Sequence, residues 1–331
     1  MRAWLMDAYE GVDKLRLTEV ADPEPAAGQA VLKILYAALN PADAFLALAQ
    51  YPAKPKFPHI LGRDGVGVVE AVGAGVTAVK PGDTVAILRG DTGVDDWGTL
   101  AQKVAVNAAQ LVPVPQGWSL QESAGAALVY LTAWQAITQW SEPAAPPKEG
   151  SVLLVTGASG GVGSASVLLG KSLGLTVVAL SRSAKKAEQL KALGADFVFD
   201  PTLPSLRKQV LAALAPRRVD LVVDSVAGPL FSELVNMLAF GGRISVVGRS
   251  GGTVPDFNTA TLFFRRNRIG GIAVSHYTSE EAHEAWNGIV TRLNAMGKRP
   301  VVDQVFAFED VKQAFARLAE GPMGKVLVKV G

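Results

Sequence analysis

A glycine-rich segment near the middle of the chain has the residue types and spacing to bind phosphate. It reads Thr156-Gly157-Ala158-Ser159-Gly160-Gly161-Val162-Gly163, follows an apolar run and opens a helical pattern. Glycines let the backbone turn tightly and approach a pyrophosphate, and a helix N-terminus supplies free N–H groups and a favourable dipole. The segment therefore predicts a dinucleotide-binding loop, and the alternative is a tight turn without a ligand. The expected contact residues are Gly157, Ser159, Gly160, Gly161, Val162 and Gly163.

The residues after the next expected strand indicate which dinucleotide binds. NAD sites carry a carboxylate there, about twenty residues after the loop, which holds the ribose 2′-OH. Here the strand is followed by Ser181, Arg182 and, three residues later, Lys185, and no acid is present. A guanidinium can hold a 2′-phosphate through two N–H groups, and the serine and lysine add a hydroxyl and an ammonium. We therefore expect NADPH, and the alternative is that these are ordinary solvated charges at a helix start.

Composition excludes several kinds of site and partner. The chain has no cysteine and three histidines, His59, His276 and His283, which are far apart in sequence. Disulfides, thiolate metal sites and a cysteine nucleophile are therefore impossible, and we expect no bound metal. A net charge of +2 without a dense basic stripe argues against nucleic acid. No apolar run is long enough for a membrane span and no secretory signal opens the sequence, so we expect a cytoplasmic protein.

The apolar pattern predicts the elements that position these residues. The length of 331 residues suits two domains. Up to about residue 120, short apolar runs alternate with Gly and Pro, which is typical of a small β-rich barrel or sandwich. Strands are expected there at 30–37, 65–72, 83–88 and 100–106, with a looser segment at 41–58 between them.

Beyond that point, strands alternate with helices, and this alternation predicts a doubly wound parallel sheet in an α/β protein. The expected strands are 151–156, 176–180, 219–223 and 243–247, and the expected helices are 162–173, 184–193 and 229–238. The tail predicts one amphipathic helix at 308–318 and a strand at 325–330 that could rejoin the first domain.

Several motifs, spread over essentially the whole chain, together resemble one family. They are Asn40-Pro41-Ala42-Asp43, Gly62–Val69, Val79–Asp83, Leu131–Trp134, the glycine segment and Gly324-Lys325-Val326. They resemble the medium-chain dehydrogenase/reductase superfamily, and most closely its zinc-free quinone oxidoreductase and enoyl reductase branch. The resemblance implies a GroES-like β-rich catalytic domain over 1–124, a Rossmann NADPH-binding domain over 125–272, and a cleft between them. It also implies a C-terminal segment, 273–331, that returns to the catalytic domain.

The chain departs from the zinc-dependent relatives where they bind zinc. Those relatives place a histidine and a glutamate in the Gly62–Gly65 stretch, where this chain has Arg63 and Asp64. They also place a ligand cysteine just ahead of Asn40, and their structural-zinc lobe is replaced here by Leu88–Trp97. The resemblance therefore implies a reaction without a zinc-bound alkoxide. A second departure is Asp200, where several NADPH-using relatives have a tyrosine next to the 2′-phosphate.

The resemblance also suggests roles for individual residues. Asn40 matches an asparagine that faces the nicotinamide, and Tyr51, eleven residues further on, matches a tyrosine near the reacting carbon. Hydride added to the β-carbon of an enone or enoyl thioester pushes negative charge onto the carbonyl oxygen, which a phenol can hydrogen-bond or protonate. The alternative is that Tyr51 only walls a pocket beside Pro52 and Pro55. The remaining cofactor contacts that the resemblance implies are Thr132, Val226, Gly248 and Arg249.

Two classes of function fit these observations. The first is a zinc-independent, NADPH-dependent oxidoreductase that passes a hydride to a small electrophile, either a quinone or a conjugated carbon–carbon double bond. The alternative is an NADPH-binding redox sensor or structural protein of the same fold with little turnover. Relatives pair the edge strand that matches Arg268–Val274 across a two-fold axis, so the resemblance also implies a homodimer.

Overall fold

The computed structural model describes residues 1–142, 144–254 and 257–331, which form two compact units. The first unit contains Met1–Leu128, Ser275–Asn287 and Arg299–Gly331, and the second contains Val129–Val274 and Gly288–Lys298. The sequence suggested that 273–331 would all return to the first domain, but 288–298 belong to the second unit. The reason is visible in their contacts, because Lys298 Nζ donates to the Ala192 carbonyl at 3.0 Å and Arg292 lies over the Trp134 ring.

A seven-stranded sheet forms the core of the first unit, in the order β15-β16-β3-β5-β6-β8, with β7 also paired to β3. The central strand β3 (Gln29–Ala38) buries Leu32 and Ile34 and pairs antiparallel with β5 (Asp64–Val72). A smaller sheet has the order β2-β1-β4. The other strands of this unit are β1 (Arg2–Met6), β2 (Arg16–Glu19), β4 (His59–Ile60), β6 (Thr84–Ile87), β7 (Lys103–Asn107), β8 (Leu111–Pro113), β15 (Val302–Ala307) and β16 (Lys325–Lys329).

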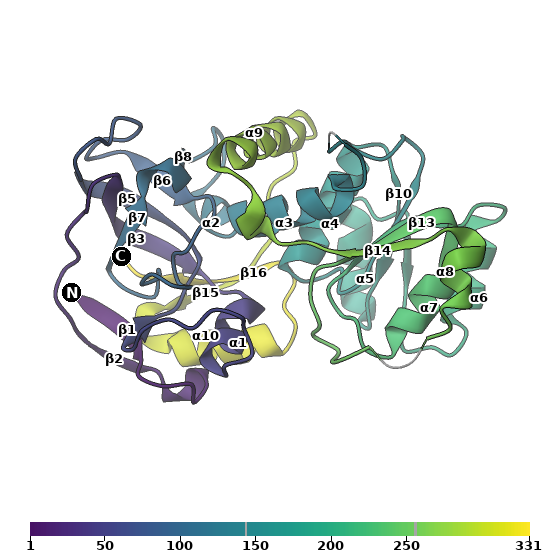
Figure 1. The fold of residues 1–331 in the computed structure, drawn as a ribbon, viewed down its shortest axis with the longest axis horizontal. Coiled ribbons are helices and arrows are strands. Elements are labelled where there is room, and N and C mark those ends of the chain that lie inside the picture. The colour runs from purple at the N-terminus through teal and green to yellow at the C-terminus, as the bar shows by residue number, and fades with distance from the viewer. Residues whose placement is uncertain (143, 255–256) are drawn as a thin grey trace. The chain divides into compact units, whose positions relative to one another are not determined.

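The C-terminal strand completes the first unit. Strand β16 runs antiparallel to β3, with Leu327 opposite Ala38, and in Figure 1 its yellow ribbon lies beside the dark N-terminal strands. Helix α10 (Val311–Ala319) buries Val311 and Phe315 in the same core. The unit also holds the helices α1 (Pro41–Ala47) and α2 (Leu120–Ala124). This return places Lys325 beside Asn40, although the two residues are far apart in the sequence.

The second unit is built on a parallel sheet in the order β11-β10-β9-β12-β13-β14. In chain order this is 3-2-1-4-5-6, which is the dinucleotide-binding arrangement and confirms the predicted α/β class. Its inner strands are continuous apolar runs because helices cover both faces. The strands are β9 (Val152–Val155), β10 (Thr176–Leu180), β11 (Phe197–Phe199), β12 (Val219–Asp224), β13 (Leu238–Val246) and β14 (Arg268–Gly271).

Helices pack on both faces of this sheet. Helix α4 (Gly161–Ser172) lies so close that a Cβ at Gly170 would be 2.6 Å from Leu153 Cδ2 on β9. The opposite face of β9 presents Val152 and Leu154 to a core shared with α6 and α7. The remaining helices are α3 (Ala127–Thr138), α5 (Ala184–Leu193), α6 (Leu206–Leu214), α7 (Leu230–Met237), α8 (Ala260–Arg265) and α9 (Ser279–Ala295), of which α3 and α9 cross between the units.

Several elements differ from the sequence expectation, and three of the differences have a local explanation. The segment that was expected to be loose contains α1, which Pro41 starts at its first turn and Asn40 and Asp43 cap reciprocally. The expected helix at 308–318 begins with a 3-10 turn, Phe308–Asp310, before α10. The edge strand expected at 268–274 ends at Gly271, because a 3-10 turn follows at Val274–His276.

Candidate active site

The glycine segment forms a tight turn between β9 and α4 in the second unit. Gly157 has a positive φ of 54°, and a Cβ there would lie 2.9 Å from Ser225 Oγ. The Gly160 N–H donates to the Gly157 carbonyl at 3.0 Å, which closes the turn. At Gly163 a Cβ would lie 2.2 Å from the Gly157 oxygen. Glycine at these positions therefore allows the first turn of α4 to pack directly on the loop.

The N-terminus of α4 has the donors that a phosphate needs. Its cap residue, Gly160, has no side chain that could accept hydrogen bonds from the helix. The N–H groups of the first turn, including those of Gly161 and Val162, have no partner within the helix. Both residues are half-buried and Gly157 is exposed, so the loop is accessible. Free N–H groups and the positive end of the helix dipole fit a pyrophosphate at this position.

The ends of two neighbouring strands close around the loop. Asp224, fully buried at the end of β12, accepts hydrogen bonds from Thr156 Oγ1 at 2.6 Å and from the Val226 N–H at 3.0 Å. Val226 also contacts the loop, since a Cβ on Gly157 would lie 3.3 Å from its Cγ2. Gly248, after β13, is packed against the Ser225 backbone. The structure therefore brings Gly157, Val226 and Gly248 together at the carboxyl edge of the sheet, where such folds bind ligands.

The basic residues expected to select the cofactor follow β10. Arg182 and Lys185 are exposed, and Ser181 is half-buried. The Ser181 hydroxyl lies within its own loop, where its oxygen is 3.3 Å from the Ser183 N–H. Asp200 is close enough to Arg182 for their charges to interact, and Thr202 donates to its carboxylate from both the backbone and the side chain. These bonds and Arg182 lower the pKa of Asp200, so an ionised carboxylate lies near the guanidinium.

The first unit holds a second group of candidate residues, around the start of α1. Asn40 is the N-cap of this helix, and its backbone N–H donates to Asp43 Oδ2 at 2.8 Å. The Asn40 side chain is 5% exposed. Its amide nitrogen donates to Asp64 Oδ2 at 2.9 Å and to the Ala38 carbonyl at 3.4 Å. Its amide oxygen accepts from Lys325 Nζ at 2.7 Å. Both ends of the Asn40 amide are therefore engaged inside the protein.

Lys325 joins this group from the last strand. Its ammonium, buried in the first unit, lies 2.9 Å from Asp64 Oδ2, and both side chains are 5% exposed or less. A buried ion pair is tolerated when further hydrogen bonds satisfy its members, and Asn40 supplies one to each. Gly125, at the end of α2, makes room for the lysine stem, since a Cβ there would lie 3.0 Å from the Lys325 Cβ.

Asp43 has an unusual environment in this cluster. It is fully buried, and among the described residues its Oδ1 has no hydrogen-bond partner. Burial raises the pKa of Asp43 from 3.8 to about 6, although the positive charges of Arg63 and Lys325 act in the opposite direction. A carboxyl group that titrates near neutral pH therefore lies at the start of α1.

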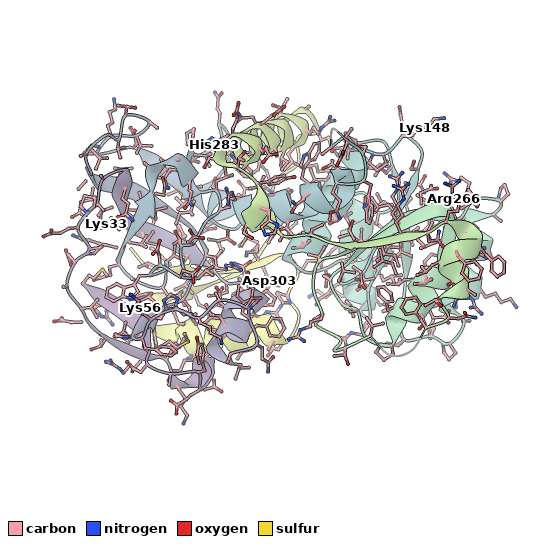
Figure 2. The ribbon with its side chains drawn as sticks, in the orientation of Figure 1. Lys33, Lys56, Lys148, Arg266, His283 and Asp303 are labelled. Atoms are coloured by element: carbon pink, nitrogen blue, oxygen red, sulfur yellow. The ribbon has the colours of Figure 1, made fainter. Side chains whose placement is uncertain are left out.

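Tyr51 follows α1 and is half-buried. Arg63 Nη2 donates to the Tyr51 phenol oxygen at 3.1 Å, and the guanidinium carbon lies 4.9 Å from the ring centre. The segment after Tyr51 is exposed at Lys56, which Figure 2 labels. A tyrosine hydroxyl both donates and accepts, whereas a guanidinium only donates. The contact with Arg63 therefore uses a lone pair of Tyr51 and leaves its O–H free to donate to a bound molecule.

The other candidate residues lie elsewhere in the two units. Thr132 is half-buried on α3, and Arg249 is exposed after β13. His59 is buried on β4, and His283, labelled in Figure 2, lies on α9 with Nε2 3.0 Å from the Ala109 carbonyl. Across the described ranges 1–142, 144–254 and 257–331, no three His, Asp or Glu side chains gather in a way that could hold a metal ion. In the same ranges no helix is long and apolar enough to cross a bilayer.

Sequence reasoning did not assign a role to three residues of these clusters. Arg63 was noted only because it replaces a zinc-site histidine, and Lys325 only as part of a closing motif. Asp224 was not singled out. The available signal was a charged residue next to a buried apolar run, since Asp64 begins β5, Lys325 begins β16 and Asp224 ends β12. Such residues are rarely buried without a partner.

Comparison with known families matches both units. The family model described as "Alcohol dehydrogenase GroES-like domain" matches residues 26–116. The family model described as "Zinc-binding dehydrogenase" matches residues 161–291. The first match contains five of the seven strands of the first unit's large sheet, and the second contains every strand of the parallel sheet except β9.

Individual proteins are similar over nearly the full length. A quinone oxidoreductase from Rattus norvegicus is 26% identical over 99% of this chain and 97% of its own. An acryloyl-coenzyme A reductase from Sulfurisphaera tokodaii is 29% identical over 95% of this chain and 96% of its own. Among solved structures, an NAD-dependent alcohol dehydrogenase is 31% identical, with a TM-score of 0.90 and full coverage of both chains. Mycobacterial Rv1454c complexed with NADPH is 25% identical, with a TM-score of 0.89 and 99% coverage of both chains.

Proposed function

The chain belongs to the zinc-free branch of the medium-chain dehydrogenase/reductase superfamily, and from this premise we propose that it is an NADPH-dependent reductase of small electrophiles. Membership makes it an oxidoreductase that uses a nicotinamide cofactor. The proposal adds the choice of NADPH and names the acceptor as a conjugated carbon–carbon double bond or a quinone.

The choice of NADPH rests on the residues after β10. They carry no acid that would bind a bare 2′-OH, and Arg182 and Lys185 are exposed cations there. Asp200 opposes this preference, because its ionised carboxylate would repel a phosphate near Arg182. Two cations and one anion leave a net positive charge for the 2′-phosphate. The turn at Gly157 and the N-terminus of α4 would hold the pyrophosphate, with Val226 and Gly248 beside it.

The role of Tyr51 follows from the charge that forms on the acceptor during reduction. When bound, NADPH supplies a hydride, which carries two electrons, and is left as NADP⁺. In an enone the β-carbon gains the new C–H bond, the carbon–carbon π bond breaks, and its electron pair moves to the carbonyl oxygen as an enolate. The Tyr51 O–H donates a hydrogen bond to that oxygen. A proton from solvent then adds to the α-carbon and restores the carbonyl group.

Asn40 and its partners act differently in this proposal. Because both ends of the Asn40 amide are bonded to Asp64 and Lys325, its side chain holds the start of α1 in place. Because Tyr51 follows α1 by a few residues, a fixed α1 also fixes the position of the backbone that carries Tyr51. Asn40 is therefore proposed as a positioning residue, and Tyr51 as the residue that contacts the substrate.

One observation carries the proposal. The Tyr51 oxygen accepts a hydrogen bond from Arg63, whose guanidinium can only donate. The hydroxyl hydrogen of Tyr51 can therefore be donated to an acceptor such as a carbonyl oxygen.

The test is NADPH consumption with a panel of quinones, enals, enones and enoyl thioesters. Tyr51→Phe should lower kcat with the carbonyl-conjugated alkenes by about ten- to a thousandfold and leave the Kd for NADPH unchanged. Tyr36→Phe is the matched control, since this tyrosine lies on β3 and its hydroxyl is 3.5 Å from Gln121 Nε2. If NADPH binds but no acceptor is reduced, the protein is a binding protein and the proposal fails.

A further inference from the structure

Arg63 lies on a backbone that is fixed on both sides. The preceding residue, Gly62, has a φ of 103°, and a Cβ there would lie 2.5 Å from Thr99 Oγ1. The Thr99 N–H donates to the Gly62 carbonyl at 3.0 Å, and its hydroxyl donates to the Asp64 carbonyl at 2.9 Å. Arg63 is therefore clamped between two residues that are bonded to Thr99. A side chain on such a backbone can hold its target precisely.

The target of this side chain is Tyr51. The guanidinium donates to the phenol oxygen at 3.1 Å and also lies 4.9 Å from the ring centre. The first contact fixes the position of the hydroxyl and the second restrains the plane of the ring. Two contacts from one rigid group leave the tyrosine little rotational freedom.

Arg63 forms no ion pair with a carboxylate of the described residues. Among the described residues, no Asp or Glu oxygen lies within ion-pair distance of its guanidinium. Buried Asp43 feels the charge at longer range, and Arg63 is the largest of the influences that oppose the rise of its pKa. The guanidinium therefore directs its hydrogen bond to the phenol oxygen, 3.1 Å away. An N–H bond from a cation stabilises negative charge on that oxygen.

We propose that Arg63 is a positioning residue that aims the Tyr51 hydroxyl at the substrate and stabilises the charge which the phenol oxygen acquires as it donates. This inference rests on the proposed function and narrows its substrate class. An enone, enal or enoyl thioester concentrates the new charge on one carbonyl oxygen, so it depends fully on the Arg63–Tyr51 pair. A quinone spreads the charge over two carbonyl groups and a ring. The pair therefore favours carbonyl-conjugated alkenes over quinones.

The experiment is a double-mutant cycle with Arg63→Met and Tyr51→Phe, assayed with an enone and a quinone. Arg63→Met should lower kcat for the enone about ten- to a hundredfold, with little change in KM for NADPH. In the Tyr51→Phe background, Arg63→Met should lower kcat for the enone by less than about twofold, because the hydroxyl through which Arg63 acts is absent. Arg63→Lys, which keeps the charge, should recover part of the loss. With the quinone as acceptor, kcat should change less than with the enone in every variant.

Arg2→Met is the matched control. Arg2 also donates to a neighbour, Glu309 Oε1 at 2.8 Å, and its guanidinium lies 5.9 Å from the Phe308 ring, so it loses comparable contacts. Its kcat should equal that of wild type. Thermal unfolding of every variant separates loss of fold from loss of rate.

A binding measurement gives a readout without turnover. Para-nitrophenolate carries a stable oxyanion and stands for the enolate oxygen. In the presence of NADP⁺, Arg63→Met should weaken its binding about tenfold when Tyr51 is present and hardly at all with Tyr51→Phe. Equal losses of kcat in both backgrounds, or phenolate binding that Arg63→Met leaves unchanged, would overturn the inference. A wild type that reduces quinones but no alkene would also overturn the inference. The proposed function fails separately, when wild type reduces no acceptor of the panel or when Tyr51→Phe reduces the alkenes at the wild-type rate.

Discussion

Asp43→Asn should gain stability relative to wild type as the pH rises from acid to neutral. The Asp43 carboxyl is fully buried at the start of α1, and its Oδ2 accepts the Asn40 N–H at 2.8 Å. An asparagine oxygen can keep that hydrogen bond, and the amide nitrogen takes the place of Oδ1, which has no partner among the described residues. The cost of burying that nitrogen is the same at every pH, so the loss of the charge is seen in how the stability changes with pH. Burial of the charged form is the main cause of the raised pKa of Asp43, and the variant no longer bears this cost.

The size of the stability change follows from the pKa of Asp43. This pKa rises from 3.8 in the unfolded chain to about 6 in the folded protein, and one pKa unit corresponds to about 1.4 kcal/mol of unfolding free energy. Below pH 3.8 both states are protonated and the stabilising contribution of the neutral acid is fully present. It is lost as the pH rises through 6, because the folded state must then release a proton that it binds more tightly. Between acid and neutral pH, the free energy of unfolding of Asp43→Asn should therefore rise by about 3 kcal/mol relative to that of wild type.

The assay is thermal unfolding of both proteins at a series of pH values from about 4 to about 7.5. For a unit of this size each kcal/mol moves the Tm by about 2–4 °C, so the difference should widen by several degrees over the series. Asp7→Asn is the control, because Asp7 is exposed and its hydrogen bond with Arg16 lowers its pKa. That variant should lose stability relative to wild type as the pH rises. A Tm difference for Asp43→Asn that stays constant with pH would refute the reasoning.

Three further predictions concern cofactor, metal and assembly. Arg182→Ala should weaken NADPH binding by about one to two orders of magnitude and leave NADH nearly unchanged, whereas Asp200→Asn should tighten NADPH alone; dissociation constants for both cofactors check this, and equal losses for NADPH and NADH would contradict it. The purified protein should contain no stoichiometric zinc and keep its activity after chelation, and elemental analysis that finds one zinc per chain would end the idea. The protein should be a homodimer that pairs through β14, because Phe264 on α8 is 74% exposed and Ile269 on the edge strand is 37% exposed. Light scattering should give a dimer mass for wild type and a monomer mass for Ile269→Lys, and a wild-type monomer at micromolar concentration would refute the pairing.

The cluster around Asn40 shows how the first unit arranges charge at the positions where, by the resemblance drawn from the sequence, zinc-dependent relatives carry metal ligands. Arg63 and Asp64 occupy those positions, and the cation that lies against Asp64 is the Lys325 ammonium, 2.9 Å away. This cation is covalently part of the chain and comes from the last strand. Its hydrogen bond to Asn40 extends the same network to the start of α1.

The sequence alone determined the features that depend on neighbouring residues. The alternation of apolar runs with helices predicted the parallel sheet, and β9, α4, β10 and α5 lie within one or two residues of their expected ranges. Glycine spacing located the turn at Gly157 because a positive φ and a close helix approach are local requirements. The helix α1 was missed although its signals, Pro41 and the Asn40–Asp43 capping box, are local as well.

Only the tertiary structure decided which distant residues share an environment. Lys325 meets Asp64 and Asn40 because β16 pairs with β3, and no local pattern encodes that pairing. Arg63 reaches Tyr51 because Thr99 holds the backbone at Gly62 and Asp64. The pKa of Asp43 depends on burial and on charges from two other strands and loops, which the packed fold alone supplies. Local propensity acts over a few residues, whereas these contacts arise when the core forms and brings segments from both ends of the chain together.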